Sequence, residues 1–325
     1  MLFAKASKAQ IWAGIIIFGS LVLALYLFLA APSHAGPSYS IAASHDRVTI
    51  QTLSHEHLPR SSKTAPEQAK SGKRLIFIGD VHGCLDELRA LLKKVKYRRG
   101  KDHIVALGDM INKGPDSKGV VDFLIAEDAS AVRGNHEDEL LRLARLDEDD
   151  SDPARPATEG VADVSAELQL VRSFSKKQLA WLRSLPMILR VGNVARHGDI
   201  VAVHGGLVPG ITLEHQSAFS VMNMRIIDPK RHTAFDKHEK KGYIPWAKYW
   251  DKHQKSTSKS LMSLGRKRVK HTTVVFGHDA RKGLQMYTYA KGLDTSCVKG
   301  NQLTAWIVGD YGEDEIIQVQ CQKYW

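Results

Sequence analysis

The sequence is poor in cysteine, with only Cys84, Cys297 and Cys321 among 325 residues. Their spacing matches neither C-x-x-C nor a zinc-finger pattern, which excludes a disulfide-stapled scaffold and a cysteine-based structural zinc module. Any zinc site therefore needs histidine and carboxylate ligands. In an oxidising compartment Cys297 and Cys321 are candidates for a disulfide, with Cys84 left buried, although distance along the chain does not decide this.

The chain also lacks an N-x-S/T sequon and an internal repeat, so a glycosylated stalk finds no support. Acidic residues are in the minority, with 35 Asp and Glu against 46 Lys and Arg and a net charge of +11. This balance predicts an anionic partner such as phosphates, nucleic acid or an anionic membrane surface. Hydrophobic residues at 43% and charged residues at 25% exclude a disordered or fibrous chain.

A stretch of 21 residues without a charge, 11–31, is long enough to cross a bilayer as one helix. Two lysines precede it and no charge follows until Asp46, so the positive-inside rule places residues 1–10 in the cytosol. We therefore expect a single-pass type II membrane protein with a signal anchor and a lumenal catalytic domain. A cleaved signal peptide is the alternative, although its apolar core is usually shorter.

Residues 32–72 are rich in Ser, Ala, His and Pro and are predicted to form a flexible stalk. From Arg74 onward, strand patterns alternate with helical ones, which predicts an α/β domain over residues 73–325. Within it, residues 140–185 are expected to form a helical cap, interrupted by an acidic surface loop at 147–156. The expected strands are 75–78, 104–107, 131–133, 187–191, 200–203, 273–276, 303–308 and 316–321, and helices are expected after the first two strands.

Five of these strands end in short clusters of Asp, Asn, His and Gly. In order they are Gly79-Asp80-Val81-His82-Gly83, Gly108-Asp109, Gly134-Asn135-His136-Glu137, His204-Gly205-Gly206 and Gly277-His278. Carboxylate and carboxamide oxygens mixed with imidazole nitrogens suit divalent cations such as Zn²⁺, Mn²⁺, Co²⁺ or Fe²⁺. Two such cations neutralise phosphate charge and lower the pKa of a water, so the clusters indicate a two-metal hydrolase.

The five clusters resemble those of the calcineurin-like metallophosphoesterases, in the branch of the Ser/Thr phosphoprotein phosphatases and the symmetric dinucleoside tetraphosphatases. The resemblance runs from about Arg74 to the C-terminus. It implies an α/β/β/α sandwich of two mixed sheets with the site at the strand ends. It also implies two divalent cations, with Zn²⁺ expected, and a set of ligands in which Asp109 bridges both cations. The first cation would be held by Asp80 and His82, and the second by Asn135, His204 and His278.

The resemblance further implies that His136 is the general acid for the leaving oxygen and that Asn112 orients it. Many phosphoprotein phosphatases read G-D-x-V-D-R-G where this chain has Gly108-Asp109-Met110-Ile111-Asn112-Lys113-Gly114. Asn112 is expected to accept an imidazole N–H but to stabilise imidazolium less than Asp does. Lys113, a point charge instead of a planar fork, should grip phosphate more loosely than Arg. Both changes weaken an assignment as a protein phosphatase.

Several strings look closest to the fungal vacuolar endopolyphosphatases of this superfamily. They are Lys113-Gly114-Pro115-Asp116-Ser117, Met222-Asn223-Met224-Arg225, Gly277-His278-Asp279-Ala280-Arg281-Lys282-Gly283 and Lys291-Gly292-Leu293-Asp294. The likeness implies endo hydrolysis of inorganic polyphosphate inside the vacuole. Arg225 and Arg281 would clamp phosphate oxygens, with Arg225 also catalytic, and Lys113 and Arg133 would complete the substrate-binding set.

Charge placement points the same way. Residues 230–271 hold 13 Lys and Arg against three acids, a net +10 of the chain's +11, so this basic insertion is expected to guide a polyanion. Its aromatic residues, Trp246, Tyr249 and Trp250, would suit single-stranded nucleic acid as bases stack on aromatic rings. They equally suit a solvated loop anchored by aromatics. The predicted topology argues against a stable nucleic-acid partner.

Four functions are compatible with these observations. An endopolyphosphatase is favoured, and a dinucleoside tetraphosphate or RNA-cap hydrolase would use the same cations. A Ser/Thr phosphoprotein phosphatase and a non-catalytic polyanion-binding membrane anchor are the others. The full set of ligand residues argues against the last. The sequence identifies neither chain-length preference nor protein partners nor an oligomeric state.

Overall fold

Alternate residues of the central strands pack into two different hydrophobic layers. In β2 (Arg74–Ile78), Leu75 and Phe77 face one layer while Ile76 and Ile78 face another. Successive side chains of a strand point to opposite faces of a sheet, so β2 is covered on both faces. These contacts are observed in a computed structural model of the protein. It describes residues 47–60, 71–150, 166–263 and 270–325.

The five-stranded sheet has the order β14-β13-β2-β3-β4. Its three strands β2, β3 and β4 are parallel, and β13 runs antiparallel to both β2 and β14. The bounds of the strands not yet given are Asp102–Ala106 for β3, Ser130–Ala131 for β4, Gln302–Val308 for β13 and Asp314–Gln320 for β14.

The six-stranded sheet has the order β1-β5-β6-β10-β12-β11 and is also mixed. Its strands are β1 (Ile50–Thr52), β5 (Ile188–Val194), β6 (Gly198–Val203), β10 (Thr272–Phe276), β11 (Gln285–Met286) and β12 (Ala290–Gly292). A small third sheet contains β7 (Ile226–Ile227), β8 (Ala234–Phe235) and β9 (Ile244–Pro245).

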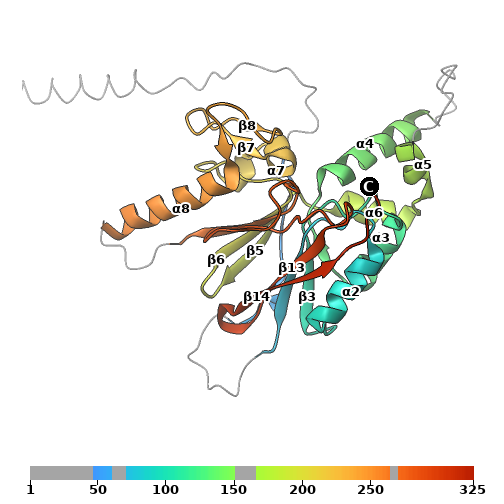
Figure 1. Ribbon diagram of the computed structural model, residues 1–325, viewed down its shortest axis with the longest axis horizontal. Helices are drawn as coiled ribbons and strands as arrows, with labels where there is room; N and C mark the ends of the chain where they lie inside the picture. The colour runs from blue at the N-terminus through green and yellow to red at the C-terminus, as the bar shows by residue number, and fades with distance from the viewer. Residues whose placement is uncertain (1–46, 61–70, 151–165, 264–269) are drawn as a thin grey trace, which may run out of the picture. The chain divides into compact units, whose positions relative to one another are not determined.

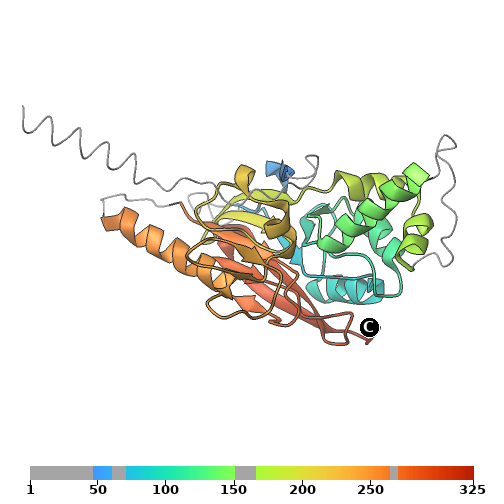
Figure 2. The same ribbon diagram turned by 90° about the horizontal axis from the view of Figure 1, so that it is seen from above.

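The two larger sheets pack face to face, because the cluster of Leu75 and Phe77 also contains Ile200 and Ala202 of β6. Helices cover the outer faces, as Figures 1 and 2 show. On the five-stranded sheet these are α2 (Leu85–Val95), α3 (Ser117–Ala126), α4 (Asn135–Asp150), α5 (Ala166–Ser173) and α6 (Lys176–Ser184). On the six-stranded sheet they are α7 (Ala218–Asn223) and α8 (Trp246–Ser263). The expected α/β/β/α arrangement with two mixed sheets is thus observed.

The expected strands and helices of the domain are present, with small shifts at their ends. The strand expected at 131–133 is the two-residue β4, and the expected acidic loop at 147–156 is helical up to Asp150, beyond which it lies outside the described residues. Sequence patterns missed β7, β8, β9, β11 and β12, since strands of two or three residues are too short for a period to show.

The prediction of a stalk over residues 32–72 is wrong for the part that the structure describes. β1 pairs in parallel with β5, and Leu53 after it is buried. The backbone N–H of Arg60 donates to Asp310, so the segment is held at a second point. The folded domain therefore includes residues well before 73, and backbone pairing outweighs the polar composition of this tract.

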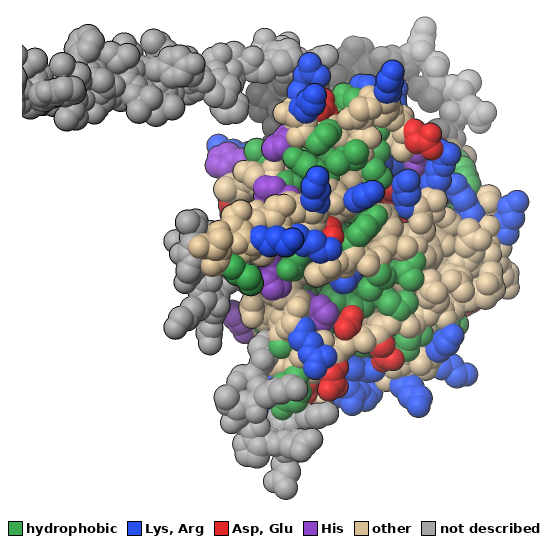
Figure 3. Space-filling model, turned by 60° about the vertical axis from the view of Figure 1, so that its left-hand side comes forward, with side chains coloured by type: hydrophobic (Ala, Val, Ile, Leu, Met, Phe, Trp, Pro, Cys, Tyr) green, Lys and Arg blue, Asp and Glu red, His purple; other side chains and the backbone are tan. Residues whose placement is uncertain are grey.

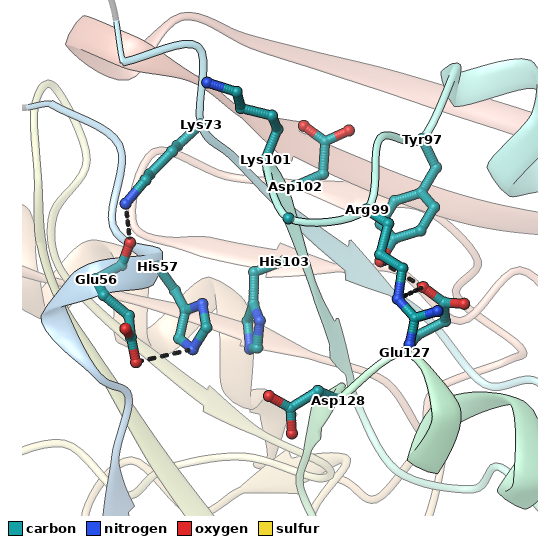
Figure 4. Close-up of a pocket in the computed structure, with 11 residues that line it drawn as sticks. Glu56, His57, Lys73, Tyr97, Arg99, Lys101, Asp102, His103, Glu127 and Asp128 are labelled. Atoms are coloured by element: carbon teal, nitrogen blue, oxygen red, sulfur yellow. Dashed lines mark hydrogen bonds and ion pairs between the residues drawn. The ribbon is translucent and has the colours of Figure 1, made fainter.

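His57, which lies in the segment expected to be a flexible stalk, stacks on His103 of β3 with ring centroids 3.8 Å apart. Figure 4 shows the two rings side by side in a cavity that β3 shares with the segment around Glu56. His55, two residues earlier, is exposed.

The predicted membrane span, 11–31, also lies outside the described residues and stays a prediction. Among the residues that the structure describes, no helix is both long and apolar enough to cross a bilayer.

Cys297 and Cys321 form a disulfide bond, with their Cα atoms 5.3 Å apart. Cys84 is free and buried at the start of α2. The pairing suggested in the sequence is therefore observed, and it ties the segment after β12 to the end of β14.

His103 should make stability fall on acidification. Burial, and then the charge of His57, lower its pKa from 6.5 to about 4. Between these values the unfolded chain binds the proton that the folded chain refuses, so about 3 kcal/mol of stability present above pH 6.5 is lost toward pH 4. We expect the melting temperature of His103→Gln to decline less steeply than wild type over this range. Exposed His55→Gln is the control, and equal slopes for all three proteins would contradict this.

Candidate metal centre

Loops at the carboxyl ends of five strands bring the predicted ligands together. They follow β2, β3, β4, β6 and β10, which belong to both large sheets. Most of these ligands line one cavity of about 350 Å³. Its lining comprises Asp80, His82, Asp109, Lys113, Asn135, His136, Arg225, His238, His278, Ala280, Arg281, Asp294, Ser296, Val298 and Lys299. Strand ends that meet at one edge of packed sheets are a common location for active sites.

Two groups of donor atoms share the carboxylate of Asp109. One group contains Asp109, His82 and His136, and the other contains Asp109, His204 and His278, with all atoms of a group within 4.8 Å. Asp109, predicted to bridge two cations, is the residue that both groups share, whereas Asp80 is in neither group and His136, predicted as the general acid, is in the first. The Oδ1 of Asn135 lies 3.1 Å from His204 Nε2, so Asn135 adds an oxygen donor to the second group.

Backbone carbonyls orient the three histidine ligands. The Nδ1 of His82 lies 3.0 Å from Ile111 O, the Nδ1 of His204 lies 2.8 Å from Leu107 O, and the Nε2 of His278 lies 3.0 Å from Asn223 O. A neutral imidazole that donates one N–H keeps a lone pair on its other nitrogen for a metal. Each ring is thus fixed in the tautomer that a metal ligand requires.

The carboxylates of the site are almost fully buried. Asp80, Asp109 and Asp294 are each at most 5% exposed. Burial and then the charge of Asp294 raise the pKa of Asp80 well above its ordinary value. Buried carboxylates grouped this closely need cations for stability. Together with the histidine tautomers, this donor set fits two divalent cations.

Asp294 was quoted in a sequence string but was not predicted as a site residue. It follows β12, lines the cavity and is hydrogen-bonded to Asp80, and it accepts the backbone N–H of Ser296 at 3.0 Å. Its position at a strand end, like that of the predicted ligands, is the signal that would have identified it.

The backbone is strained where it presents the ligands. His82, Asp109 and His278 have φ angles of 46°, 49° and 68°, and Asn112 and Lys113 also lie in the left-handed region. Residues with a Cβ rarely adopt this conformation, and such strain is typical of functional sites.

Two glycines permit a close approach between loops. A Cβ on Gly277 would lie 2.1 Å from Asp80 Oδ1, and one on Gly108 would lie 2.8 Å from His204 Nδ1. Either contact would displace a ligand, so at these positions a side chain is excluded by space.

Glu137 holds the backbone of two ligand loops in place; it was quoted in the third strand-end cluster but was not predicted as a site residue. Its fully buried carboxylate accepts backbone N–H groups of Asp109 and Met110, both at 2.8 Å, and of Gly134 at 2.9 Å. Burial and then the charge of Asp109 raise its pKa to about 7. The sequence does contain a signal for this burial. Glu137 lies three and four residues before Leu140 and Leu141, which places it on the apolar face of α4.

His136 lies at the rim of the first donor group, with its Nε2 3.8 Å from Asp109 Oδ2. The Nδ2 of Asn112 is 3.2 Å from His136 Nδ1, while the Oδ1 of Asn112 accepts the backbone N–H of Lys113 at 2.7 Å. Asn112 therefore contacts the predicted general acid through its amide nitrogen, while its oxygen, which was expected to accept an imidazole N–H, is occupied by the backbone N–H of Lys113.

Cations surround the cavity. The Nζ of Lys113 lies 3.1 Å from His82 Nε2, and burial lowers the pKa of Lys113. Arg225, largely buried, donates to His278 O at 3.2 Å. Arg281 is exposed and Lys299 also lines the cavity.

Both predicted clamp arginines are paired with acids of one loop, between β8 and β9. Asp236 contacts Arg225 and lies 3.4 Å from His278 Nε2, and Glu239 lies 3.6 Å from Arg281. These pairs hold the guanidinium groups at the cavity edge.

Arg133 differs from the other predicted substrate-binding residues. Its guanidinium donates to Asp138 at 3.4 Å and to the carbonyl of Arg183 at 2.9 Å, and it does not line the cavity. The structure thus gives Arg133 a role in tying α4 to α6.

The aromatic residues of the basic insertion are not arranged as a stacking surface. Trp246 and Trp250 are buried in the core beneath α8, and Tyr249 donates to the carbonyl of Pro229 at 3.2 Å. The structure therefore favours the interpretation that these aromatic residues anchor the basic insertion to the core, over the one in which they stack on nucleic-acid bases.

The chain is similar to several known proteins. A zinc-dependent endopolyphosphatase of Saccharomyces cerevisiae is 30% identical, with 98% of both chains covered. A symmetrical bis(5'-nucleosyl)-tetraphosphatase of Neisseria meningitidis is 28% identical over 75% of this chain and 94% of its own. The crystal structure of a proposed diadenosine tetraphosphatase superposes with a TM-score of 0.62 at 31% identity, covering 85% of this chain and 99% of that one.

The sequence matches the family described as calcineurin-like phosphoesterase over residues 73–310. This range contains all the strand-end loops that form the two donor groups. The chain is therefore a member of the calcineurin-like phosphoesterase family, a family of metallophosphoesterase hydrolases.

Proposed function

We propose that this protein hydrolyses the phosphoanhydride bonds of inorganic polyphosphate, cutting within the chain. The observation that carries the proposal is the composition of the cavity beside the donor groups. Lys113, Arg225, Arg281 and Lys299 line it, and among its described lining residues there is no Phe, Tyr or Trp. Such a cavity offers charge for phosphates and no Phe, Tyr or Trp side chain on which a base would stack. The similar endopolyphosphatase of yeast supports the same substrate.

Two divalent cations, with zinc as the proposed pair, would be held by Asp80, His82, Asp109, Asn135, His204 and His278. When bound, they neutralise phosphate charge and make a water acidic enough to attack at neutral pH. The chain's own groups position the substrate. Arg225 and Arg281 bind phosphate oxygens through planar forks, while Lys113 supplies a point charge close to His82.

His136 is the proposed proton donor to the leaving oxygen. Its Nε2 faces the cavity beside Asp109, and Asn112 holds the ring through Nδ1. Burial lowers the pKa of His136, which makes it a readier donor when it is protonated. Asn112 orients the ring without adding the negative charge that an aspartate would bring.

A dinucleoside tetraphosphate hydrolase is the second candidate, favoured by the similarity to bis(5'-nucleosyl)-tetraphosphatases. It would use the same cations and the same proton donor. The protein-phosphatase alternative is weaker because Asn112 and Lys113 replace the residues that those enzymes use. We further propose that residues 11–31 anchor the protein with this domain on the lumenal side of a vacuolar membrane.

Substrate preference tests the proposal directly. Full-length protein is first treated with a chelator and reloaded with Zn²⁺, Mn²⁺ or Co²⁺, and then given polyphosphate, diadenosine tetraphosphate or a phosphopeptide. We expect chelation to abolish activity and polyphosphate to have the highest kcat/KM. Products of intermediate length should appear early if cleavage is internal. A higher kcat/KM for the dinucleotide would instead establish the second candidate.

His136→Ala should lower kcat by about 10²-fold or more, because proton transfer to the leaving group is lost. Asn112→Ala should lower kcat by about tenfold, since the ring loses its orientation but not its proton. Bound metal, measured by elemental analysis, should stay at the wild-type ratio in both. Exposed His215→Ala is the matched control. If His136→Ala retained activity within a few-fold, another group would be the acid.

A further inference from the structure

Helix α8 carries all of its four lysines on one side. Lys248, Lys252, Lys255 and Lys259 are exposed, and the spacings of four, three and four residues place them within an arc of about 60°. With a rise of about 1.5 Å per residue, the row extends for about 16 Å along the helix. Figure 3 shows Lys and Arg side chains spread over the face of the domain on which α8 lies.

The opposite side of α8 is fixed to the domain. Trp246 and Trp250 are buried against the six-stranded sheet, and the indole N–H of Trp250 donates to Thr272 O at 3.1 Å. The rotation of the helix is therefore set by its core side. The lysine row cannot turn inward without removing these tryptophans from the core.

The row borders a groove of about 520 Å³ that the four lysines line together with Asp251, Ser256 and Tyr287. Asp251 is the one acid of α8, and it is already engaged. It accepts from Lys255 Nζ at 2.6 Å and from the backbone N–H of Tyr289 at 2.9 Å. The groove thus keeps a surplus of positive charge.

Two stretches of the chain connect the groove to the metal-centre cavity. The backbone N–H of Trp246, the first residue of α8, donates to Arg225 O at 3.2 Å, and Arg225 lines the metal-centre cavity. On the other side, Arg281 lines that cavity and Tyr287, six residues later, lines the groove. The end of α8 that carries Lys248 is therefore the end that is hydrogen-bonded to the backbone of the proposed phosphate clamp.

We propose that this groove is a second binding site, which holds the part of a polyphosphate chain that extends beyond the metal centre. The inference rests on the proposed function and adds to it a preference for long chains. A polyanion of regularly spaced charges complements a row of lysines, and each contact releases counterions. Contacts at both sites on one chain raise affinity through effective concentration. The path past Arg225 favours this occupant over a membrane surface.

The test neutralises the row in full-length, zinc-loaded protein as Lys248→Gln, Lys252→Gln, Lys255→Gln and Lys259→Gln combined. We expect KM for long-chain polyphosphate to rise about fivefold to tenfold with kcat unchanged. KM for tripolyphosphate, too short to reach the groove, should stay within twofold. The salt dependence of KM for long chains should become shallower.

A matched control neutralises four exposed lysines of other helices, Lys93, Lys118, Lys176 and Lys177. It removes the same charge and should leave KM for long chains near wild type. An equal rise in both variants would show a general charge effect and overturn the inference. No change in the α8 variant, or equal changes for long and short substrates, would also overturn it.

Two further measurements separate this inference from the proposed function. Binding of fluorescent long-chain polyphosphate to metal-free protein should weaken in the α8 variant even if the wild type proves to cleave dinucleotides better. If that binding is unchanged while the α8 variant loses the preference of the wild type for phosphatidylserine vesicles over uncharged phosphatidylcholine vesicles, the groove is a membrane-binding surface and the inference is wrong.

Discussion

The carboxylate of Asp109 is the point on which the site depends. Both donor groups include it, so its position sets the separation of any two cations that they hold. It sits on a strained turn whose backbone N–H groups are held by the buried carboxylate of Glu137. Because Glu137 also holds Gly134, one side chain aligns the loops after β3 and β4. The geometry of the centre is thus supported by an acid that faces away from the cavity.

The sandwich explains how residues far apart in sequence reach this point. β2, β3 and β4 contribute ligands from one sheet, while β6 and β10 contribute them from the other. The shared layer that contains Phe77 and Trp306 fixes the sheets against each other, so the two sets of loops meet in a constant register. Close packing of this kind transmits small displacements, which is why core volume matters for the chemistry at the edge.

Strand-end motifs made much of the site predictable, since glycine and ligand residues sit together after each strand. The supporting role of Glu137 was not predicted, although the residue belongs to one of these motifs, because the sequence of a helix does not show that an acid on it is buried. Arg133 was predicted to bind phosphate because it precedes a ligand cluster. Its actual partners, Asp138 and the carbonyl of Arg183, are brought to it by tertiary structure, which the sequence does not show. The role of β1 was missed because pairing with β5 requires no hydrophobic run. Local sequence patterns predict where strands end, but they do not predict which polar groups form hydrogen bonds or ion pairs in the folded protein.

The loop between β8 and β9 has a consequence for how anions reach the arginines. Asp236 and Glu239 already neutralise Arg225 and Arg281, so no bare guanidinium waits for a ligand. Binding a phosphate there is an ion exchange, in which a protein carboxylate is released for each oxyanion that arrives. The net gain per arginine is then reduced by the cost of separating the existing pair, a cost that is small for Arg281 and Glu239, where both side chains are exposed. Small anions such as chloride or a single phosphate therefore gain little binding free energy from the exchange. These arginines orient a bound phosphate more than they raise its affinity.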